Sequence, residues 1–383
     1  MYDAIVVGAG PAGGMAARQL AHAGLRTLVL DKKRVVGEPV QCAEGVSRFG
    51  LESNGVRVER EWVMQEVRGA RCVVPCGRSF AITDEPGYAI DRARFDRWVL
   101  DGALSEGAEL RASSRVTQVT REDGRWRVHV GAETFETSAV VAADGPTSSV
   151  ARGLGLLRRH ESILAYEYRF LRKDVEVPDP NRFHLFIGRR YAGGYAWIFP
   201  KGDAVNVGVG GHIDAHAVAV AFCAEHGIDP ADRVATIAGT IPYRFELTTF
   251  ALPGLTIAGD AAGVTNPMNG AGIHSGLFSG RLAGRALVRA HEEGDPDAAL
   301  EYDRALRAST FLDPLLFWMI ERYRTWDDRL LDAVGEELDG GDWHDVGLSK
   351  ALSAAVRRPR LVAHSLDFVR MRRALALCEK YGW

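Results

Sequence analysis

Three glycines near the N-terminus constrain the fold of this chain more than any other feature of its sequence. They are Gly8, Gly10 and Gly13, and they lie between the apolar run at residues 4–7 and an alanine-rich helical segment. In such a strand-to-helix turn, the first glycine allows the tight bend, the second lets the backbone approach a pyrophosphate, and the third lets the helix lie close to the strand. We therefore expect a Rossmann-like parallel sheet, with these three glycines in contact with a dinucleotide.

The second predicted strand, residues 26–30, ends in an acidic residue. Asp31 follows the glycine turn at roughly the separation of about 20 residues that is typical of a ribose-binding carboxylate. Such a carboxylate accepts a hydrogen bond from a ribose hydroxyl and disfavours a 2′-phosphate. The pattern therefore indicates FAD or NAD at this turn rather than NADP.

Length and composition exclude several classes of protein. The 383 residues suffice for two joined domains and a C-terminal extension, and the net charge of −3 gives no footprint of nucleic-acid binding. The chain opens directly on a core strand, without an export signal, and no apolar run approaches the length of a membrane span. We expect a cytoplasmic protein with reduced cysteines, and the sequence leaves a peripheral membrane contact open.

We expect no metal site. The spacing Cys72-x-x-x-Cys76 resembles half of a zinc site, but a second ligand pair at finger-like spacing is missing. Pro75 and Gly77 instead favour a turn between two short strands.

A loop rich in glycine, proline and polar residues follows Asp31 and contains Pro39-Val-Gln-Cys42-Ala-Glu44-Gly45. Loops after parallel strands face the ligand crevice, so we expect Cys42 beside the reactive end of a cofactor. The alternative is that Cys42 is a small, buried and inert residue.

Two stretches, residues 57–89 and 163–209, alternate short apolar runs with turns, which predicts a second domain of antiparallel strands. Within the later stretch, Tyr195, Trp197 and Phe199 alternate and therefore share one face of a strand. Such an aromatic face either lines an apolar pocket or belongs to an ordinary core.

Further segments are expected to complete the dinucleotide-binding domain. Asp91 is a candidate cap for a helix that places Arg92 at its start, within reach of a phosphate or a ring carbonyl. One strand ends in Asp144-Gly145 before a serine-rich helix start, and another ends in Gly259-Asp260 before a second glycine cluster and a long helix. Strand ends of this kind point at a ligand, although the first is also compatible with an ordinary capped turn.

Two strand pairs are expected between these segments. Residues 107–110 and 114–119 are predicted to pair in the nucleotide-binding sheet, and residues 126–130 and 134–137 to form a β-hairpin around Gly131.

From residue 301 on, the composition is helical. The apolar run Phe311–Ile320 is expected to be a packing helix, and a lid over an apolar substrate or a membrane-surface contact is the alternative. Six arginines follow that would serve such a contact: Arg357, Arg358, Arg360, Arg370, Arg372 and Arg373.

Taken together, the turns at Gly8–Gly13, Asp144-Gly145 and Gly259-Asp260 resemble those of the flavoprotein superfamily of para-hydroxybenzoate hydroxylase. Within it, the Pro39–Gly45 loop and the segment Tyr195-x-Trp197-x-Phe199-Pro200 are similar to those of the geranylgeranyl reductases, which saturate isoprenoid carbon–carbon double bonds. The similarity covers about residues 1–290. One departure is Ala192, which stands where the reductase pattern has a proline.

The resemblance implies FAD as the cofactor and a set of residues that contact it. This set is Ala12, Asp31, Cys42, Ala43, Gly45, Arg92, Val116, Asp260, Gly272 and Ile273, which adds to Gly8, Gly10, Gly13 and the strand-end Asp144. It also implies that Cys42 lies near the isoalloxazine ring and that Tyr195 and Trp197 lie in the substrate cavity. These last three are the candidate catalytic residues.

The expected fold class is α/β, or α+β over the whole chain. A Rossmann-like FAD-binding domain (1–56, 90–157 and 250–295) carries an inserted antiparallel β-sheet substrate domain (57–89 and 158–249), and a helical C-terminal region (296–383) follows.

The expected function is hydride transfer from reduced flavin to a carbon–carbon double bond of an apolar, isoprenoid-type substrate. The chief rival is a flavin monooxygenase or halogenase, because the Trp-x-Trp-x-Ile-Pro segment of halogenases is close to the segment at Tyr195. A non-enzymatic flavin-binding module is the third reading. No second glycine-rich fold for NAD(P)H is visible, so the external reductant is either transiently bound NAD(P)H or a reduced ferredoxin-like electron-transfer protein. The sequence gives no oligomeric state.

Overall fold

The computed structural model describes residues 1–83, 85–343 and 364–379. The chain forms two compact units. The first unit comprises Met1–Val40, Asp91–Ser162 and Ile241–Asp313, and the second comprises Gln41–Ile90, Ile163–Thr240 and the described residues from Pro314 on.

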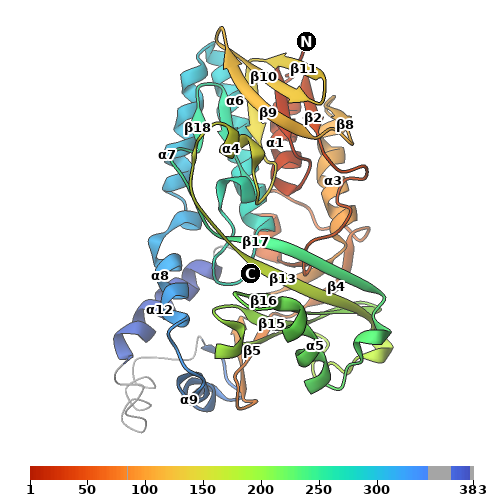
Figure 1. Cartoon of the computed structure of the whole chain (residues 1–383), viewed down its shortest axis with the longest axis vertical. Coiled ribbons are helices and arrows are strands. Elements are labelled where there is room, and N and C mark those ends of the chain that lie inside the picture. Colours follow the sequence, from red (N-terminus) through yellow and green to blue (C-terminus); the bar gives the residue numbers. More distant parts are fainter. Residues whose placement is uncertain (84, 344–363, 380–383) are drawn as a thin grey trace. The chain divides into compact units, whose positions relative to one another are not determined.

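A six-stranded sheet is the centre of the first unit (Figure 1). Its order is β18 (Ala251–Leu252), β19 (Leu255–Ile257), β12 (Ala139–Ala142), β1 (Ala4–Val7), β2 (Thr27–Leu30) and β8 (Glu109–Arg111). All neighbours are parallel except β18 and β19. The strands β1, β2, β12 and β19 are buried along their whole length, which explains their continuous apolar sequences.

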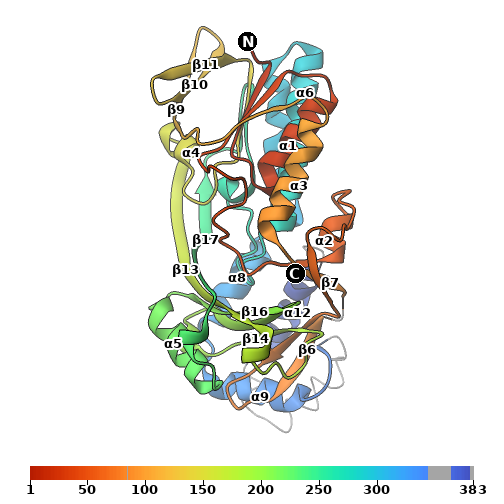
Figure 2. The same cartoon turned by 90° about the vertical axis from the view of Figure 1, so that its right-hand side faces the viewer.

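Three helices of the first unit, α1 (Pro11–His22), α3 (Arg92–Leu104) and α6 (Ile273–Glu293), lie side by side (Figure 2). Glycines allow this close packing. A Cβ atom at Gly280 of α6 would lie 2.0 Å from the carbonyl oxygen of Ala12, and one at Gly14 would lie 2.9 Å from Val99 of α3. Two shorter helices, α4 (Ser149–Gly153) and α7 (Glu301–Arg307), also belong to this unit.

The strand that follows β8 is not part of the parallel sheet, so the predicted strand pair at residues 107–119 is wrong. β9 (Val116–Glu122) pairs antiparallel with β10 (Arg125–Val130), which in turn pairs with β11 (Glu133–Thr137) in a separate three-stranded sheet. The tight turn at Asp123 and Gly124, both with positive φ, determines this pairing. The predicted hairpin around Gly131 is confirmed.

The second unit is built on a seven-stranded sheet. Its order is β17 (Ala235–Leu247), β13 (Leu157–Leu171), β16 (Ala204–Gly211), β15 (Tyr195–Lys201), β14 (Phe183–Phe186), β5 (Ala70–Val73) and β6 (Ser79–Thr83). Antiparallel pairing prevails, as expected, but β5 and β14 run parallel. A smaller sheet joins β3 (Gly45–Ser47), β7 (Gly87–Ile90) and β4 (Val63–Val67), and the short helix α2 (Arg48–Glu52) follows β3.

One face of the seven-stranded sheet is covered by α5 (Ala215–Glu225). Ala196 and Ile198 of β15 pack on this side with Phe222 of the helix. Because side chains alternate along a strand, the residues between them point to the opposite face. That opposite face carries Trp197 and Phe199 within a second apolar cluster.

The apolar run near residue 315 forms α8 (Pro314–Tyr323), and its residues Leu316, Met319 and Ile320 are buried, which confirms the packing role. α9 (Asp328–Leu338) and α12 (Ser365–Glu379) follow. Arg370 of α12 lies over the ring of Trp318, so this arginine packs on α8. Arg357, Arg358 and Arg360 lie outside the described residues.

The turn between β5 and β6 is as the sequence indicates. The amide of Gly77 donates to the carbonyl oxygen of Val74, and Gly77 has a positive φ. Cys72 is buried and Cys76 is exposed, and burial raises the pKa of the Cys72 thiol to about 12.

The compact units differ from the expected domains at several places, among them residues 158–162 and 241–249, which belong to the first unit. Residues 41–56 belong to the second unit, because β3 pairs with β7 and the side chain of Glu44 is held by residues of β13, β15 and β16. The described residues after 296 form no third unit, since the division passes between Asp313 and Pro314.

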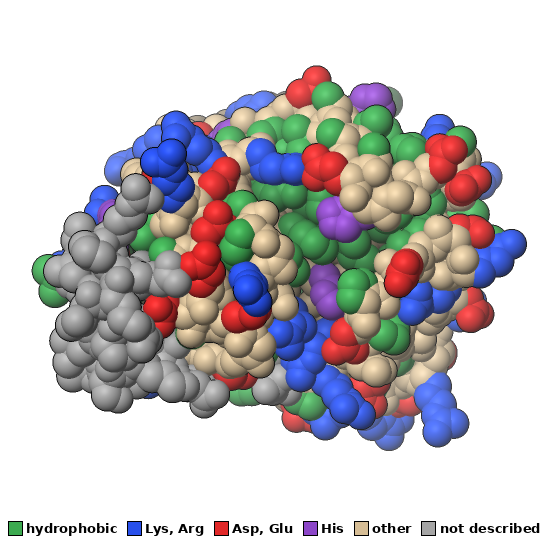
Figure 3. All heavy atoms as spheres, turned by 90° about the horizontal axis from the view of Figure 1, so that it is seen from below, with side chains coloured by type: hydrophobic (Ala, Val, Ile, Leu, Met, Phe, Trp, Pro, Cys, Tyr) green, Lys and Arg blue, Asp and Glu red, His purple; other side chains and the backbone are tan. Residues whose placement is uncertain are grey.

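Charges of both signs are mixed on the molecular face in Figure 3, where Lys and Arg side chains are interspersed with Asp and Glu. Among the described residues, the structure has no helix of the length and apolarity that crossing a bilayer requires.

Candidate active site

The glycine turn of the first unit has the geometry that its sequence predicts. Gly8 has φ +101°, and a Cβ atom there would lie 2.2 Å from the carbonyl oxygen of Ala143. A Cβ atom at Gly13 would lie 1.8 Å from the carbonyl oxygen of Gly8, whereas one at Gly10 would meet nothing within 4 Å. Gly8 and Gly13 are therefore required by internal packing, and Gly10 faces open space.

Asp31 is buried at the end of β2, where it holds the glycine turn. Its two carboxylate oxygens accept hydrogen bonds from the backbone amides of Ala9 and Lys33, each at 2.7 Å. Each carboxylate oxygen can accept a second hydrogen bond. Asp31 therefore has a local role, and a ribose hydroxyl as a further donor is compatible with it.

The N-termini of α1 and α6 lie close together in the first unit. A Cβ atom at Gly276 would lie 3.7 Å from the amide nitrogen of Ala12 and 3.8 Å from Pro11. Both helices begin at a glycine, Gly10 or Gly272, with no capping hydrogen bond from a side chain. Two helix starts with these amides and partial positive charges form a site for an anionic or electron-rich group.

Acidic and basic side chains border these helix starts. Arg92 donates to both carboxylate oxygens of Asp96, at 3.0 and 3.1 Å, which orients its guanidinium group at the start of α3. Asp91 caps this helix as predicted, by accepting from the amide of Arg94. Burial raises the pKa of Asp260, while the hydroxyl of Thr265 and the charge of Arg92 act in the opposite direction.

These features fit a dinucleotide cofactor. The open space at Gly10, the paired helix starts and the ribose-compatible Asp31 provide for a pyrophosphate and its sugar. Two further predicted contacts also have an evident local role. The carboxylate of Asp144 accepts from the hydroxyl of Ser148 and the amide of Ser149, at the start of α4, and Val116 is buried at the start of β9.

In the second unit, the aromatic residues of β15 share one face, as predicted. The ring centroids of Tyr195 and Trp197 are 5.7 Å apart, and those of Trp197 and Phe199 are 6.2 Å apart. Phe183 of β14 stacks on Phe199 at 4.2 Å. Burial raises the pKa of Tyr195 well above its usual value, so this phenol is neutral across the physiological range.

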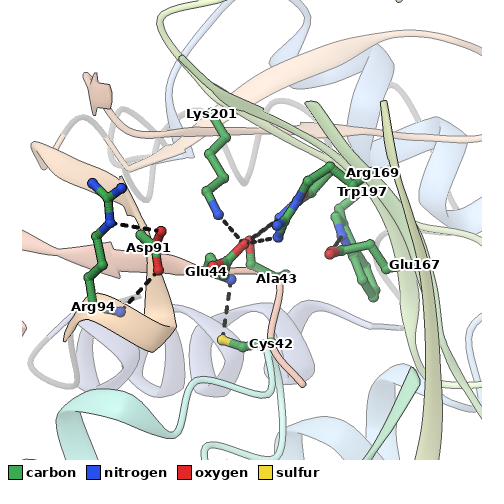
Figure 4. A network of polar contacts seen from close by, with 10 residues as sticks. Cys42, Ala43, Glu44, Asp91, Arg94, Glu167, Arg169, Trp197 and Lys201 are labelled. Atoms are coloured by element: carbon green, nitrogen blue, oxygen red, sulfur yellow. Dashed lines mark hydrogen bonds and ion pairs between the residues drawn. The ribbon is translucent and has the colours of Figure 1, made fainter. Parts of the chain in front are cut away.

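The loop that contains Cys42 is anchored on this same aromatic face (Figure 4). The buried side chain of Glu44 accepts hydrogen bonds from Arg169, Lys201 and Asn206. The amide of Asn206 also donates to the carbonyl oxygen of Ala43 at 3.1 Å. The anchoring residues come from the three strands β13, β15 and β16, so the sheet fixes the position of the loop.

Backbone constraints complete the anchoring. Glu44 has φ +68°, and its carbonyl oxygen accepts from the amide of Ile90 at 2.9 Å. A Cβ atom at Gly45 would lie 2.9 Å from the ring of Phe183, so only glycine lets the loop lie this close to the sheet. Cys42 is half-buried, and its sulfur accepts a hydrogen bond from the amide of Glu44 at 3.2 Å. A negative charge on this sulfur would raise the pKa of Tyr195 further, so the two side chains are close enough to interact.

In the second unit, the structure brings together Cys42, Ala43, Gly45, Tyr195 and Trp197, and their contacts with FAD and substrate stay predictions. The remaining predicted cofactor residues lie in the first unit. Sequence reasoning missed Glu44 as the anchor of the loop, since its partners are more than a hundred residues away along the chain. It also missed Glu167, which accepts a hydrogen bond from the indole N–H of Trp197 at 2.7 Å. For Glu167, the available signal was an acidic residue between Tyr166 and Tyr168 in a predicted strand.

The departure at Ala192 has a structural correlate. Ala192 has φ +43°, in the left-handed region. Proline is restricted to a φ of about −65° and cannot adopt this conformation. The turn before β15 therefore differs here from one that accommodates a proline.

Comparisons with known proteins agree with this architecture. Residues 3–71 match the model of an FAD binding domain, and residues 162–222 match that of the geranylgeranyl reductase catalytic domain. The digeranylgeranylglycerophospholipid reductase of Methanocella arvoryzae is 31% identical, over 96% of this chain and 99% of that protein. One such reductase of Methanopyrus kandleri is 34% identical, over 78% of this chain and 80% of that protein.

Solved structures show the same relationship. A geranylgeranyl bacteriochlorophyll reductase-like protein from Thermoplasma acidophilum superposes with a TM-score of 0.83 at 28% identity, over 96% of this chain and 99% of that chain. A flavin-dependent brominase has a TM-score of 0.67 at 18% identity, over 96% and 99% of the two chains, and shares the fold.

The fold, the glycine turn and the matched cofactor domain define an FAD-dependent oxidoreductase. Within that class, the chain belongs to the geranylgeranyl reductase family.

Proposed function

We propose that this protein reduces carbon–carbon double bonds in the isoprenoid chains of a lipid of the geranylgeranyl type. The observation that carries the proposal is the anchoring of the Cys42 loop on the aromatic face of β15 by buried polar contacts. An apolar aromatic wall suits a hydrocarbon chain. The related reductases named above act on digeranylgeranylglycerophospholipids, which are substrates of this class.

Different residues of this chain would bind the cofactor, bind the substrate and assist the transfer of the proton. Gly8, Gly10 and Gly13, with the start of α6, would hold the FAD pyrophosphate on backbone amides. When bound and reduced, FAD supplies the hydride that saturates one carbon of the double bond, and a proton completes the other. Tyr195 and Trp197 would bind the hydrocarbon chain and exclude water, and Cys42 would tune the flavin or relay the proton.

The reaction needs an external source of electrons. We propose a reduced ferredoxin-like protein or a transiently bound NAD(P)H. A stopped-flow experiment that mixes the oxidised, yellow protein with each donor under anaerobic conditions distinguishes them, because flavin bleaching is fast only with the true donor.

The decisive test of the function is anaerobic turnover. Dithionite-reduced protein is incubated with geranylgeranyl lipids, and the products are analysed by mass spectrometry. We expect the mass to rise by two hydrogen atoms per reduced bond in ordinary water and by two deuterium atoms in heavy water, because dithionite supplies only electrons and both hydrogens come from the solvent. Oxygen consumption in step with product formation, and no anaerobic product, would instead establish a monooxygenase or halogenase.

A further inference from the structure

A row of three residues crosses the sheet of the second unit beside the candidate substrate wall. Glu167 of β13 is directly opposite Gly208 of β16, and Gly208 is directly opposite Trp197 of β15. Directly opposite residues on neighbouring strands point to the same face. Glu167 and Trp197 therefore share the face that carries Tyr195 and Phe199.

The glycine in the middle of the row makes the contact between the outer two possible. A Cβ atom at Gly208 would lie 2.4 Å from Cζ2 of Trp197, so the indole ring lies directly across the backbone of β16. In this position its Nε1–H donates to Oε2 of Glu167 at 2.7 Å (Figure 4). Any larger residue at this position would displace the ring.

The surroundings of Glu167 favour its neutral form. The side chain is buried, and its second oxygen, Oε1, has no hydrogen-bond partner among the described residues. Burial raises the pKa of Glu167 to about 8, and the charge of Glu44 acts in the same direction. The indole N–H, Arg169 and Lys201 act to lower this pKa, but both cations are paired with Glu44.

We propose that Glu167 is a positioning residue of the substrate wall: as a neutral carboxylic acid, it holds the indole of Trp197 across β16, and its ionisation weakens the binding of an apolar chain. The second half of this proposal rests on the proposed function, since it takes the apolar chain to be the substrate. The first half is a property of the protein without substrate. On ionisation Oε2 keeps the indole N–H as its donor, but the buried Oε1 has no donor among the described residues. This uncompensated buried charge is costly and draws water in beside the ring.

The first experiment needs no substrate. The FAD-bound protein is labelled with 15N in its indole groups, and the Trp197 Nε1–H signal, assigned by its loss in Trp197→Phe, is followed from about pH 6 to about pH 9.5. We expect the signal to shift with a midpoint near pH 8 in the wild type and in Glu176→Gln, which alters an exposed glutamate of the same unit. Glu167→Gln keeps an acceptor for the indole but cannot ionise, so its signal should not titrate in this range. An unchanged titration in Glu167→Gln, or none in the wild type, overturns the proposal.

The second experiment measures anaerobic kinetics with a geranylgeranyl lipid. If only the neutral form binds the chain, KM should rise about tenfold between about pH 7 and about pH 9 in the wild type, with little change in kcat. KM should stay flat in Glu167→Gln, which also separates this effect from titration of Cys42. A flat KM in the wild type, or equal rises in both proteins, overturns the link to substrate binding. Absence of any reduction refutes the proposed function, and the indole titration still decides the role of Glu167.

A pair of glycine variants tests the same geometry without changing a titratable group. Gly208→Ala should displace the indole and remove the characteristic Trp197 signal, with a KM raised about tenfold at about pH 7. Gly210→Ala on the same strand is the matched control, because its Cβ would lie 3.6 Å from the indole in ordinary contact. Equal behaviour of the two variants contradicts a role for Gly208.

Discussion

Cys42 is held in place by its own loop, since its sulfur accepts the amide of Glu44 and the loop is anchored on the sheet. Exchange of Cys42 for Ala or Ser should therefore leave the backbone and the bound flavin unchanged. If the thiol relays a proton or tunes the flavin, single-turnover alkene reduction should slow by about tenfold or more. The visible spectrum of the flavin checks cofactor content, and Cys76→Ala, at an exposed site of the same unit, is the control. Unchanged turnover would remove Cys42 from the mechanism.

Glu44 carries a larger structural role than any neighbour in its loop. Replacing it with Ala leaves Lys201 buried and Arg169 mostly buried without their shared partner. Loss of one member of a buried ion pair costs about 3–5 kcal/mol, so the free energy of unfolding should fall by roughly that amount. The exposed pair of Glu66 and Arg48 provides the comparison.

Chemical denaturation measures both variants. Glu66→Ala should cost less than about 1 kcal/mol, because exposed ion pairs contribute little. Similar losses in Glu44→Ala and Glu66→Ala would contradict the view that the Glu44 cluster fixes the loop.

Sequence reasoning at the residue scale succeeded where the signal is local. The roles of Gly8 and Gly13, the cap at Asp91 and the shared face of Tyr195 and Trp197 all follow from spacing within a few residues. The partners of Glu44 come from strands far along the chain, and a single sequence carries no record of such pairing.

At the scale of elements, the contact between α1 and α6 determines the paired helix starts of the first unit. Gly280→Ala would place a methyl group 2.0 Å from the carbonyl oxygen of Ala12 and must push the helices apart. We expect FAD affinity to fall by about tenfold or more and the melting temperature to fall by several degrees, since overpacking costs about 1–3 kcal/mol.

Fluorescence titration of the apoprotein with FAD measures the affinity. Gly153→Ala is the matched control, because a Cβ atom there meets nothing within 4 Å. If Gly280→Ala binds FAD as tightly as Gly153→Ala does, the helix contact does not shape the cofactor site.

The elements also show what pattern reading misses. The spacing of apolar residues predicts β9 as a strand but places it in the parallel sheet, whereas β9 pairs with β10. Periodicity shows that a segment is a strand and does not show with which strand it pairs. The dipeptide Asp123-Gly124 was the missed signal, since it favours a tight hairpin between β9 and β10.

At the scale of the whole molecule, the two units could be foreseen but not their boundaries. The switch from a parallel to a mainly antiparallel pattern predicted two bodies. The segment at residues 41–56 follows a Rossmann strand in sequence, yet its contacts with the second sheet place it in the other unit. The order of the segments along the chain therefore predicts that there are two units. Long-range polar contacts decide to which unit residues 41–56 belong.

The stability of the whole protein should depend on pH through His274, in the first turn of α6. This histidine is buried and packs edge-to-face on Phe311, with ring centroids 5.2 Å apart. Burial, with a smaller effect of Arg281, lowers the pKa of His274 to about 4 from its usual 6.5. The folded state thus holds the neutral ring. The resulting stability is fully present above about pH 6.5 and is lost as the pH falls towards 4, because the unfolded chain binds the proton first.

The shift corresponds to at most about 3 kcal/mol. The free energy of unfolding of the FAD-saturated protein should therefore fall more steeply between about pH 7 and about pH 4 in the wild type than in His274→Gln. His22→Gln alters an exposed histidine, whose side chain is 76% accessible, and should keep the wild-type slope. Denaturant titrations at each pH give the slopes directly. Since carboxylates titrate equally in all three proteins, the difference between the two variants isolates His274, and parallel slopes would show that its proton affinity is not altered by folding.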